Sequence, residues 1–275
     1  MNLYRYMIEH PIARAYIPAA PLLRMPEPAQ TIFLWLTVCM AAVVLVIAII
    51  MSRRYRSPTP LFMVSGALVA IVMEPIVTYL GHAVHPDIGA VVMFRAVDRT
   101  IPWHIGLGYL AAYGTVYLIL YPRMVARSIT TAYIWKLLVV AALVFALFEI
   151  VPVMHGLWVY YGYQPLRPWP GMAPIAWNFL NASSMIGGAT LMYVALTRLR
   201  GWSQILLIPL AAVGTAMTHV GAGLPLYVGM NAALPQWAVQ LCALAAVALS
   251  LVLVWLCTVV IELIQRQSAP SAVGI

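Results

Sequence analysis

The sequence predicts an all-α integral membrane protein, a polytopic bundle of about seven transmembrane helices. The first observation behind this prediction is composition: hydrophobic residues fill 64% of the 275 positions, charged residues only 8%, and the mean hydropathy is +0.94. A soluble domain of this size could not bury so much apolar surface, so its solvent must be lipid. The net charge of +8 then reflects topology and contact with anionic headgroups, and no nucleic-acid partner is predicted.

The second observation is a series of apolar segments, each long enough to supply the roughly 20 helical residues that a bilayer requires. Seven such segments follow one another along the chain, at residues 30–51, 59–81, 102–121, 133–155, 172–197, 202–224 and 235–263. Short polar connections separate them. Each segment is therefore expected to form one membrane-spanning helix.

The third observation is that positive charge alternates between successive connections. Arginines follow the first, third, fifth and seventh segments, namely Arg53, Arg54 and Arg56, then Arg123 and Arg127, then Arg198 and Arg200, and finally Arg266. The positive-inside rule then predicts an outer N-terminus and a cytoplasmic C-terminus, in what we expect to be a bacterial inner membrane. Arg95 and Arg99, in the connection after the second segment, run against this pattern and are partly offset by Asp87 and Asp98.

The chain is expected to divide into three parts. Residues 1–29 form an N-terminal tail that can lie in the membrane interface, residues 30–265 form the seven-helix transmembrane domain, and residues 266–275 form a cytoplasmic tail. The N-terminal tail contains five prolines and no continuous apolar core, so it does not resemble a cleaved signal peptide. The three cysteines all lie within apolar segments, which indicates no disulfide framework.

Two glutamates interrupt the apolar segments. Glu74, in the second segment, is followed directly by Pro75, and Glu149, in the fourth, lies three residues before Pro152. A carboxylate in hydrocarbon is costly unless it is paired, hydrated or protonated. Each proline also leaves one helical carbonyl without its usual donor. The two glutamates are therefore the strongest candidates for functional residues.

The predicted topology places the other unusual polar residues at the depth of the glutamates, in the outer half of the membrane. Glu74, Thr78 and His82 recur every four residues and should form one stripe along a helix. Asn178 and Asn181 share one face of the fifth segment in the same way. Polar stripes on membrane helices face the bundle interior, so we expect a polar chamber that opens to the outside. The residues expected around it also include Trp103, His104, His155, Tyr161, Gln164, Trp177 and His219.

Simpler structural explanations exist for many of these residues. Asparagine and threonine often bridge membrane helices, tyrosine and tryptophan form belts at the interface, and histidines near a membrane surface are usually solvated. The two glutamates are harder to explain in this way, because burying an acid without a purpose is so unfavourable.

The function predicted from these residues is acid–base catalysis on a lipophilic, isoprenoid-like substrate, by cyclisation or isomerisation. A carboxylic acid in an apolar pocket can stay protonated and act as a general acid. Glu74 is predicted to be the proton donor, with Glu149, Asn178 and His219 as base or orienting groups. The predicted substrate-binding residues are Thr78, His82, Trp103, His104, His155, Tyr161, Gln164, Trp177 and Asn181. No acidic cluster of the DDxxD type occurs, which argues against ionisation of a diphosphate.

Three other classes of function stay open at this point. His82, His85 and Asp87 form an H-x-x-H-x-D pattern that could ligate a metal. The primary prediction, however, includes neither a metal nor another cofactor. Acids beside prolines also occur in proton-coupled transporters. The third class is a membrane assembly subunit without chemistry. Membrane lipids are the other expected partners, and the sequence does not indicate an oligomeric state.

Three motifs carry a resemblance to known proteins: MEPIVTYLG, IPWHIGLGY, and FEI with YYGYQPLRPWPG and WNFLN. Over residues 60–190 they resemble a group of polytopic membrane proteins common in actinobacteria, for which the resemblance implies no particular activity. The seven short-looped spans also resemble the integral-membrane terpene cyclases of fungal meroterpenoid pathways. That resemblance implies one acid in an early span, which Glu74 matches, and one late in the chain. Glu262 lies at the cytoplasmic end of the last segment, so His219 is the nearest substitute for the late acid.

Overall fold

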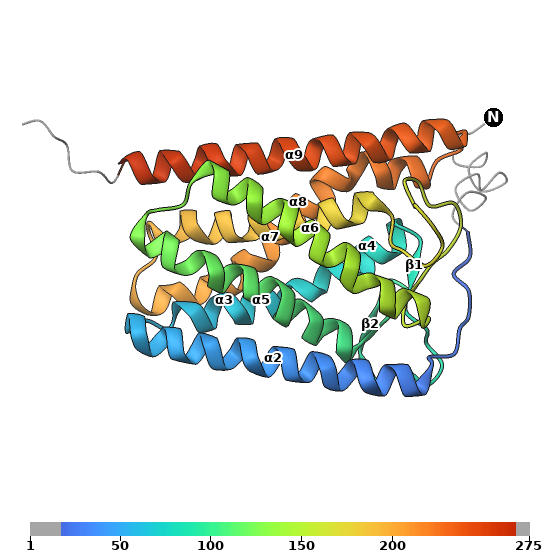
Figure 1. The fold of residues 1–275 in the computed structure, drawn as a ribbon, viewed down its shortest axis with the longest axis horizontal. Coiled ribbons are helices and arrows are strands. Elements are labelled where there is room, and N and C mark those ends of the chain that lie inside the picture. Colours follow the sequence, from blue (N-terminus) through green and yellow to red (C-terminus); the bar gives the residue numbers. More distant parts are fainter. Residues whose placement is uncertain (1–17, 268–275) are drawn as a thin grey trace, which may run out of the picture.

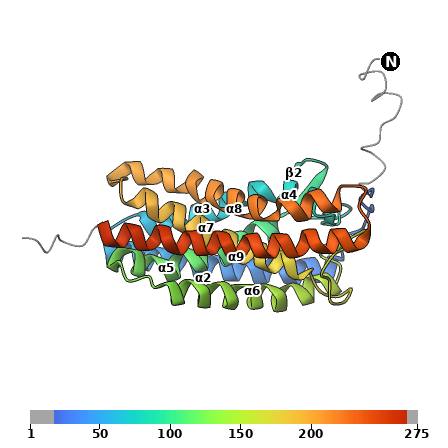
Figure 2. The ribbon, with the colours of Figure 1, turned by 90° about the horizontal axis from the view of Figure 1, so that it is seen from above.

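The computed structural model describes residues 18–267 and confirms the predicted fold class. Within that part of the chain, seven spans are long and apolar enough to cross a membrane, and they lie side by side as an up-and-down bundle (Figures 1 and 2). The protein is therefore an integral membrane protein by the length and composition of its helices. Most of the interfacial tail predicted for residues 1–29 and of the cytoplasmic tail predicted for residues 266–275 lies outside the described residues.

The spans agree with the predicted segments, but two of them are built from more than one piece. The helices are α2 (Glu27–Tyr55), α3 (Thr59–Val69), α4 (Glu74–Leu80), α5 (Trp103–Ala126), α6 (Thr131–Met154), α7 (Ile175–Leu196), α8 (Leu207–Met230) and α9 (Gln236–Gln267). A 3₁₀ turn, η2 (Ala70–Met73), separates α3 from α4 within the second span, and η3 (Gly201–Leu206) precedes α8. The break in the second span is where its glutamate lies.

Pro75 explains the position of that break. It lies in the first turn of α4, where a helix tolerates proline because the missing N–H would have no intrahelical partner. Pro75 cannot donate to the carbonyl of Ile71, and the N–H of Glu74 donates to that carbonyl instead, in the tighter 3₁₀ pattern. Glu74 is thus the first residue of a new helix within the span.

Short strands in the described chain gather at one end of the bundle, which we call the strand end. There β1 (Ala83–Val84) pairs antiparallel with β4 (Val159–Tyr160), and β2 (Val92–Ala96) pairs antiparallel with β3 (Arg99–Pro102). The strand end is also where α2 begins, and α9 ends at the opposite end (Figure 1). Because the connections alternate between the two ends, the arginine-rich loops after α2, α5 and α7 all lie away from the strands. The charge asymmetry predicted from the sequence is thus an asymmetry between the two ends of the bundle.

Arg99 and Gln30 hold the loops of the strand end in place. The guanidinium of Arg99 is buried, donates to the Ala83 carbonyl at 3.2 Å and to the Tyr161 hydroxyl at 2.6 Å, and lies over the ring of Tyr79. The side chain of Gln30 bonds the Gly89 carbonyl and accepts from the Val91 N–H. These contacts fasten the connection between α4 and α5 to its neighbours.

Small residues allow close packing between the central helices. A Cβ atom added at Gly66 of α3 would lie 2.5 Å from the Cβ of Ala211 and 3.0 Å from the carbonyl oxygen of Ile208, both in α8. Neither atom can move without moving the α8 backbone. Membrane helices commonly associate through such small residues, because lipid provides no hydrophobic force to join them.

We expect Gly66→Ala to lower the free energy of unfolding by about 1–3 kcal/mol, the usual cost of overpacking a close contact. The matched control is Gly221→Ala in α8, where an added Cβ meets no atom within 4 Å. That change should be neutral or stabilising, because alanine favours a helix over glycine by up to about 1 kcal/mol. Unfolding in detergent micelles measures both variants, and equal effects would contradict the packing described here.

Candidate functional site

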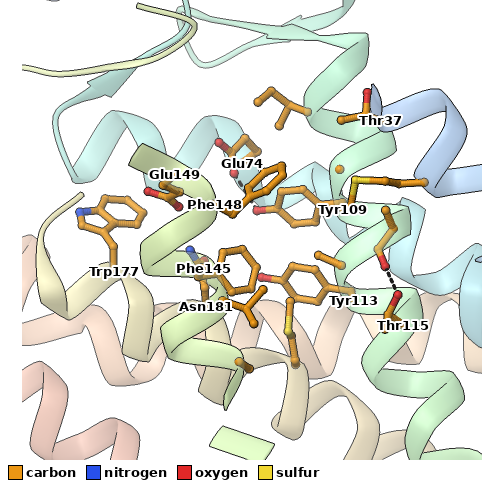
Figure 3. A pocket seen from close by; sticks show the side chains of 18 of the residues that line it. Thr37, Glu74, Tyr109, Tyr113, Thr115, Phe145, Phe148, Glu149, Trp177 and Asn181 are labelled. Atoms are coloured by element: carbon orange, nitrogen blue, oxygen red, sulfur yellow. Dashed lines mark hydrogen bonds between the residues drawn. The ribbon is translucent and has the colours of Figure 1, made fainter. Parts of the chain in front are cut away.

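A cavity of about 420 Å³ lies between α2, α5, α6 and α7 and reaches the first turn of α4. Its volume is within the roughly 300–1,000 Å³ of small-molecule sites. Most of its wall is apolar, and both Glu74 and Glu149 line it. Figure 3 shows the two acids and Tyr109 around one region of the cavity, with Thr115 farther along α5. The glutamates that the sequence singled out therefore belong to one site.

Glu74 has two side-chain hydrogen-bond partners. Its Oε1 lies 3.1 Å from Nε2 of His85, and its Oε2 accepts from the Tyr109 hydroxyl at 2.7 Å. His85 is buried, and the Glu74 side chain is 13% exposed. Thr78, one turn later, also lines the cavity but donates to the backbone carbonyl of Glu74. Both carboxylate oxygens of Glu74 thus have a partner.

Glu149 has a different environment. It is buried near the strand end of α6, and the Tyr160 hydroxyl donates to its Oε2 at 2.9 Å. Tyr160 belongs to β4, outside the spans. Its burial is the main cause that raises the pKa of its hydroxyl well above the ordinary value, and the neighbouring Glu149 adds to this. That hydroxyl therefore stays protonated and acts as a donor. Phe145 and Phe148 of the same helix also line the cavity, four residues and one residue before Glu149. Glu74 interacts electrostatically with Glu149.

An aromatic cluster lies behind the two acids, between α7 and α8. The ring of Trp177 is 5.9 Å from the ring of Tyr160 and 5.8 Å from the ring of His219. Nδ1 of His219 lies 3.1 Å from the Tyr227 hydroxyl. His219 is completely buried, does not line the cavity, and interacts electrostatically with Glu74. Its place is therefore behind Glu74 rather than beside a ligand.

Six of the predicted site residues line the cavity, and two lie close behind it. The lining residues are Glu74, Glu149, Thr78, His104, Trp177 and Asn181. Asn178 and His219, which were predicted to be catalytic, are buried and do not line it. Helical spacing alone did not fix which way each of these two side chains points.

His82, Tyr161 and Gln164 serve the loops instead of the cavity. The predicted stripe ends early because α4 stops at Leu80, and His82 adopts a left-handed backbone conformation, with φ of 51°. Its ring stacks on Tyr161 and its Nε2 lies 3.2 Å from Oδ1 of Asn231, while burial lowers its pKa. Nε2 of Gln164 donates to the carbonyls of Gly81, His82 and Tyr161. These three residues, which were predicted to bind substrate, thus contact the loops of the strand end and do not line the cavity.

Trp103 and His155 lie at the periphery of the bundle. Trp103 begins α5, is 43% exposed, and does not line the cavity. His155 is exposed just after α6 and its Nδ1 lies 2.8 Å from the Val151 carbonyl oxygen. Neither residue is placed to bind a ligand together with the two glutamates.

The residues of the metal pattern point to different partners. His82 contacts Asn231, His85 contacts Glu74, and Asp87 accepts from Thr100 and from Arg95. These two donors lower the pKa of Asp87, Thr100 contributing the larger part. Between residues 18 and 267, no group of three or more histidine, cysteine, aspartate or glutamate side chains could hold a metal ion.

Sequence reasoning missed the tyrosines around the acids. Tyr109, Tyr113 and Tyr117 recur every four residues along α5, which places them on one face. The rings of Tyr109 and Tyr113 stack at 4.9 Å, and the Tyr113 hydroxyl lies 3.0 Å from Oγ of Ser184. The same spacing rule that identified the other stripes could have found this one.

The sequence predicted a chamber that opens to the outside, at the strand end. The cavity does not open there. The lining residues there are buried, namely Phe33, Ala83, His85, His104 and Trp158. The exposed lining residues lie near the middle of their helices instead, namely Met40, Thr115, Ile119, Val140 and Val144. The accessible side of the cavity thus faces the lipid.

Comparisons with known protein families, with curated proteins and with solved structures found no match. Conclusions about function therefore depend on the chemistry of the cavity.

We expect Tyr109→Phe to lower the free energy of unfolding by about 1.5–3 kcal/mol at neutral pH, the range for a hydrogen bond to a charged group. The variant removes one donor from Glu74 while keeping the ring that stacks on Tyr113. Combining it with Glu74→Gln should reduce the cost of losing the hydroxyl to about 0.6 kcal/mol, typical of neutral bonds between membrane helices. Equal costs in both backgrounds would mean that Tyr109 does not stabilise a carboxylate.

Proposed function

We propose that this protein is an integral membrane enzyme that isomerises or cyclises a lipophilic, isoprenoid-like substrate by acid–base chemistry. The observation that carries the proposal is the unequal surroundings of two acids on one apolar cavity. Within the described chain, two polar side chains contact the Glu74 carboxylate, whereas a tyrosine hydroxyl contacts Glu149 among phenylalanines. Two carboxyl groups in different environments can divide the roles of acid and base.

The surroundings support Glu149 as the acid and Glu74, with His85, as the base. An apolar environment with few donors favours the neutral carboxylic acid, which can give up a proton. Hydrogen bonds from Tyr109 and from His85 favour the carboxylate form of Glu74. This assignment reverses the one made from the sequence, in which Glu74 was the donor.

The proposed reaction balances without a further reactant. Glu149 transfers its proton to one carbon of a C=C bond, and the positive charge forms on the neighbouring carbon. Tyr109 and Phe148 line the cavity, and an aromatic ring face can stabilise such a charge. The carboxylate of Glu74 then removes a proton from an adjacent carbon, which moves the double bond or ends a ring closure. Return of that proton to Glu149 restores the enzyme, with no net oxidation or reduction.

Deuterium transfer from solvent to carbon tests this proposal. Purified protein in lipid nanodiscs would be incubated in D₂O with acyclic polyprenyl alcohols, aldehydes and epoxides, and with neutral lipids extracted from the producing cells. Mass spectrometry should find carbon-bound deuterium and a product isomer with the wild-type protein. The Glu74→Gln/Glu149→Gln double variant is the control and should give none. Failure of the wild type to label any of these lipids would defeat the proposal.

A further inference from the structure

The arrangement of the helices leaves the lipid-facing side of the cavity without a wall at mid-depth. Helix α6 packs against α7 and α9, whereas α5 packs mainly against α2 and α3. Val144 of α6 and Ile119 of α5 both line the cavity, yet they are 59% and 43% exposed. The space between α5 and α6 therefore connects the cavity with the middle of the bilayer.

We propose that a single-chain neutral lipid, with one uncharged oxygen group at its head, passes head-first from the bilayer between α5 and α6 into this cavity. The inference deepens the proposed function, on which it rests for the identity of the acids as the reacting groups.

The charges around the cavity support an uncharged head. Two glutamates line it, and no lysine or arginine is among its lining residues within the described chain. A phosphate or carboxylate head would meet two acids and no lysine or arginine to pair with. A head that enters at mid-depth also passes through hydrocarbon, which is strongly unfavourable for any charged group. A hydroxyl, carbonyl or epoxide oxygen carries no charge, so neither the acids of the cavity nor the hydrocarbon of the bilayer disfavours it in this way.

The dimensions support a linear chain. Val144 lies five residues before Glu149, which is about 7.5 Å along the axis of α6. A short polar head beside the glutamates therefore leaves its chain running along Phe145 and out past Val144. The buried strand end leaves no second exit for the other chain of a two-chain lipid, since Trp158 and His85 close that side.

Photolabelling tests both parts of the inference without requiring turnover. The probe is a diazirine derivative of hexadecanol in nanodiscs, and hexadecanol, hexadecanoic acid, hexadecyl phosphate and hexadecylamine are the competitors. We expect labelled peptides from α5 and α6 that hexadecanol suppresses and the three charged lipids do not. Equal or better competition by the acid, the phosphate or the amine would overturn the neutral-head assignment.

A tryptophan at the opening tests the route. Val144→Trp should lower labelling by about tenfold, equivalent to about 1.4 kcal/mol of binding free energy, because the indole fills the space between α5 and α6. Leu143→Trp is the matched control, since Leu143 is 58% exposed on the same helix but does not line the cavity. Val140→Trp with its control Val139→Trp repeats the comparison if the first variant does not fold. Unchanged labelling in a folded Val144→Trp or Val140→Trp would overturn the route.

The two proposals fail in different ways. A protein that is labelled as expected but never transfers deuterium would refute the enzyme and leave the lipid site in place. If the wild type transfers deuterium but Val144→Trp does not change the labelling, the proposed reaction stands and the access route is refuted.

Discussion

Replacing Glu149 by glutamine should lower deuterium transfer to carbon by roughly 10²–10⁴-fold, the usual contribution of a general acid. The amide has nearly the same shape as the acid but carries no acidic proton. If Glu149 supplies the first proton, the cation never forms. Neither the product nor the recovered substrate should then contain deuterium.

The glutamine variant is expected to fold. The Tyr160 hydroxyl, which donates to Oε2 of Glu149, can donate to the amide oxygen instead. Melting in detergent should therefore stay close to that of the wild type, and Glu149→Asp should recover part of the activity. A folded Glu149→Gln protein with full deuterium transfer would exclude Glu149 as the acid and return that role to Glu74.

The fold was predictable because the bilayer imposes a simple condition on every span. A helix in hydrocarbon must satisfy its backbone internally and be apolar over about 20 residues, so each span is visible as one segment. The glutamates were predictable for the same reason, since an acid is conspicuous in such a segment. Helical spacing put Thr78 and Asn181 on the polar faces expected around one chamber, and both line the cavity, as does Trp177, which was expected there from its depth alone.

The loops were not predictable by this reasoning. His85 reaches Glu74 only because the chain turns back after α4, where His82 has a left-handed conformation and β1 pairs with β4. Tyr160 reaches Glu149 from that same pair of strands. Contacts of this kind depend on turn geometry and on long-range pairing, and neither leaves a periodic signal in the sequence.

The direction in which the cavity opens was also beyond the sequence. Polar residues at one depth indicated a chamber near the outer surface, and the most economical expectation was an opening on that side. Buried side chains close that side, including Trp158 from the loop between α6 and β4 and Phe33 from α2. Whether α5 and α6 contact each other depends on how each packs against other helices of the bundle. No local pattern in the sequence of α5 or α6 indicates that packing.

Replacing Glu74 by glutamine should give a different result from the change at Glu149. The product should again fall by roughly 10²–10⁴-fold, because no carboxylate is present to remove the second proton. Glu149 is intact, however, and can still transfer a deuteron to the double bond. The cation then has one way back, by losing a proton or the deuteron to Glu149.

Return of the cation to substrate can be detected as deuterium in the recovered substrate. Whenever the cation returns a proton and keeps the deuteron, the recovered substrate carries carbon-bound deuterium although no product forms. The amide of Glu74→Gln can still accept from the Tyr109 hydroxyl and lie beside His85, so the site should keep its shape. Labelled substrate without product in Glu74→Gln, and unlabelled substrate in Glu149→Gln, would assign base and acid separately. The opposite pattern would reverse the two roles. Labelled product from Glu74→Gln would show that another residue is the base. His85 is then the nearest candidate, because its Nε2 lies 3.1 Å from the Glu74 carboxylate.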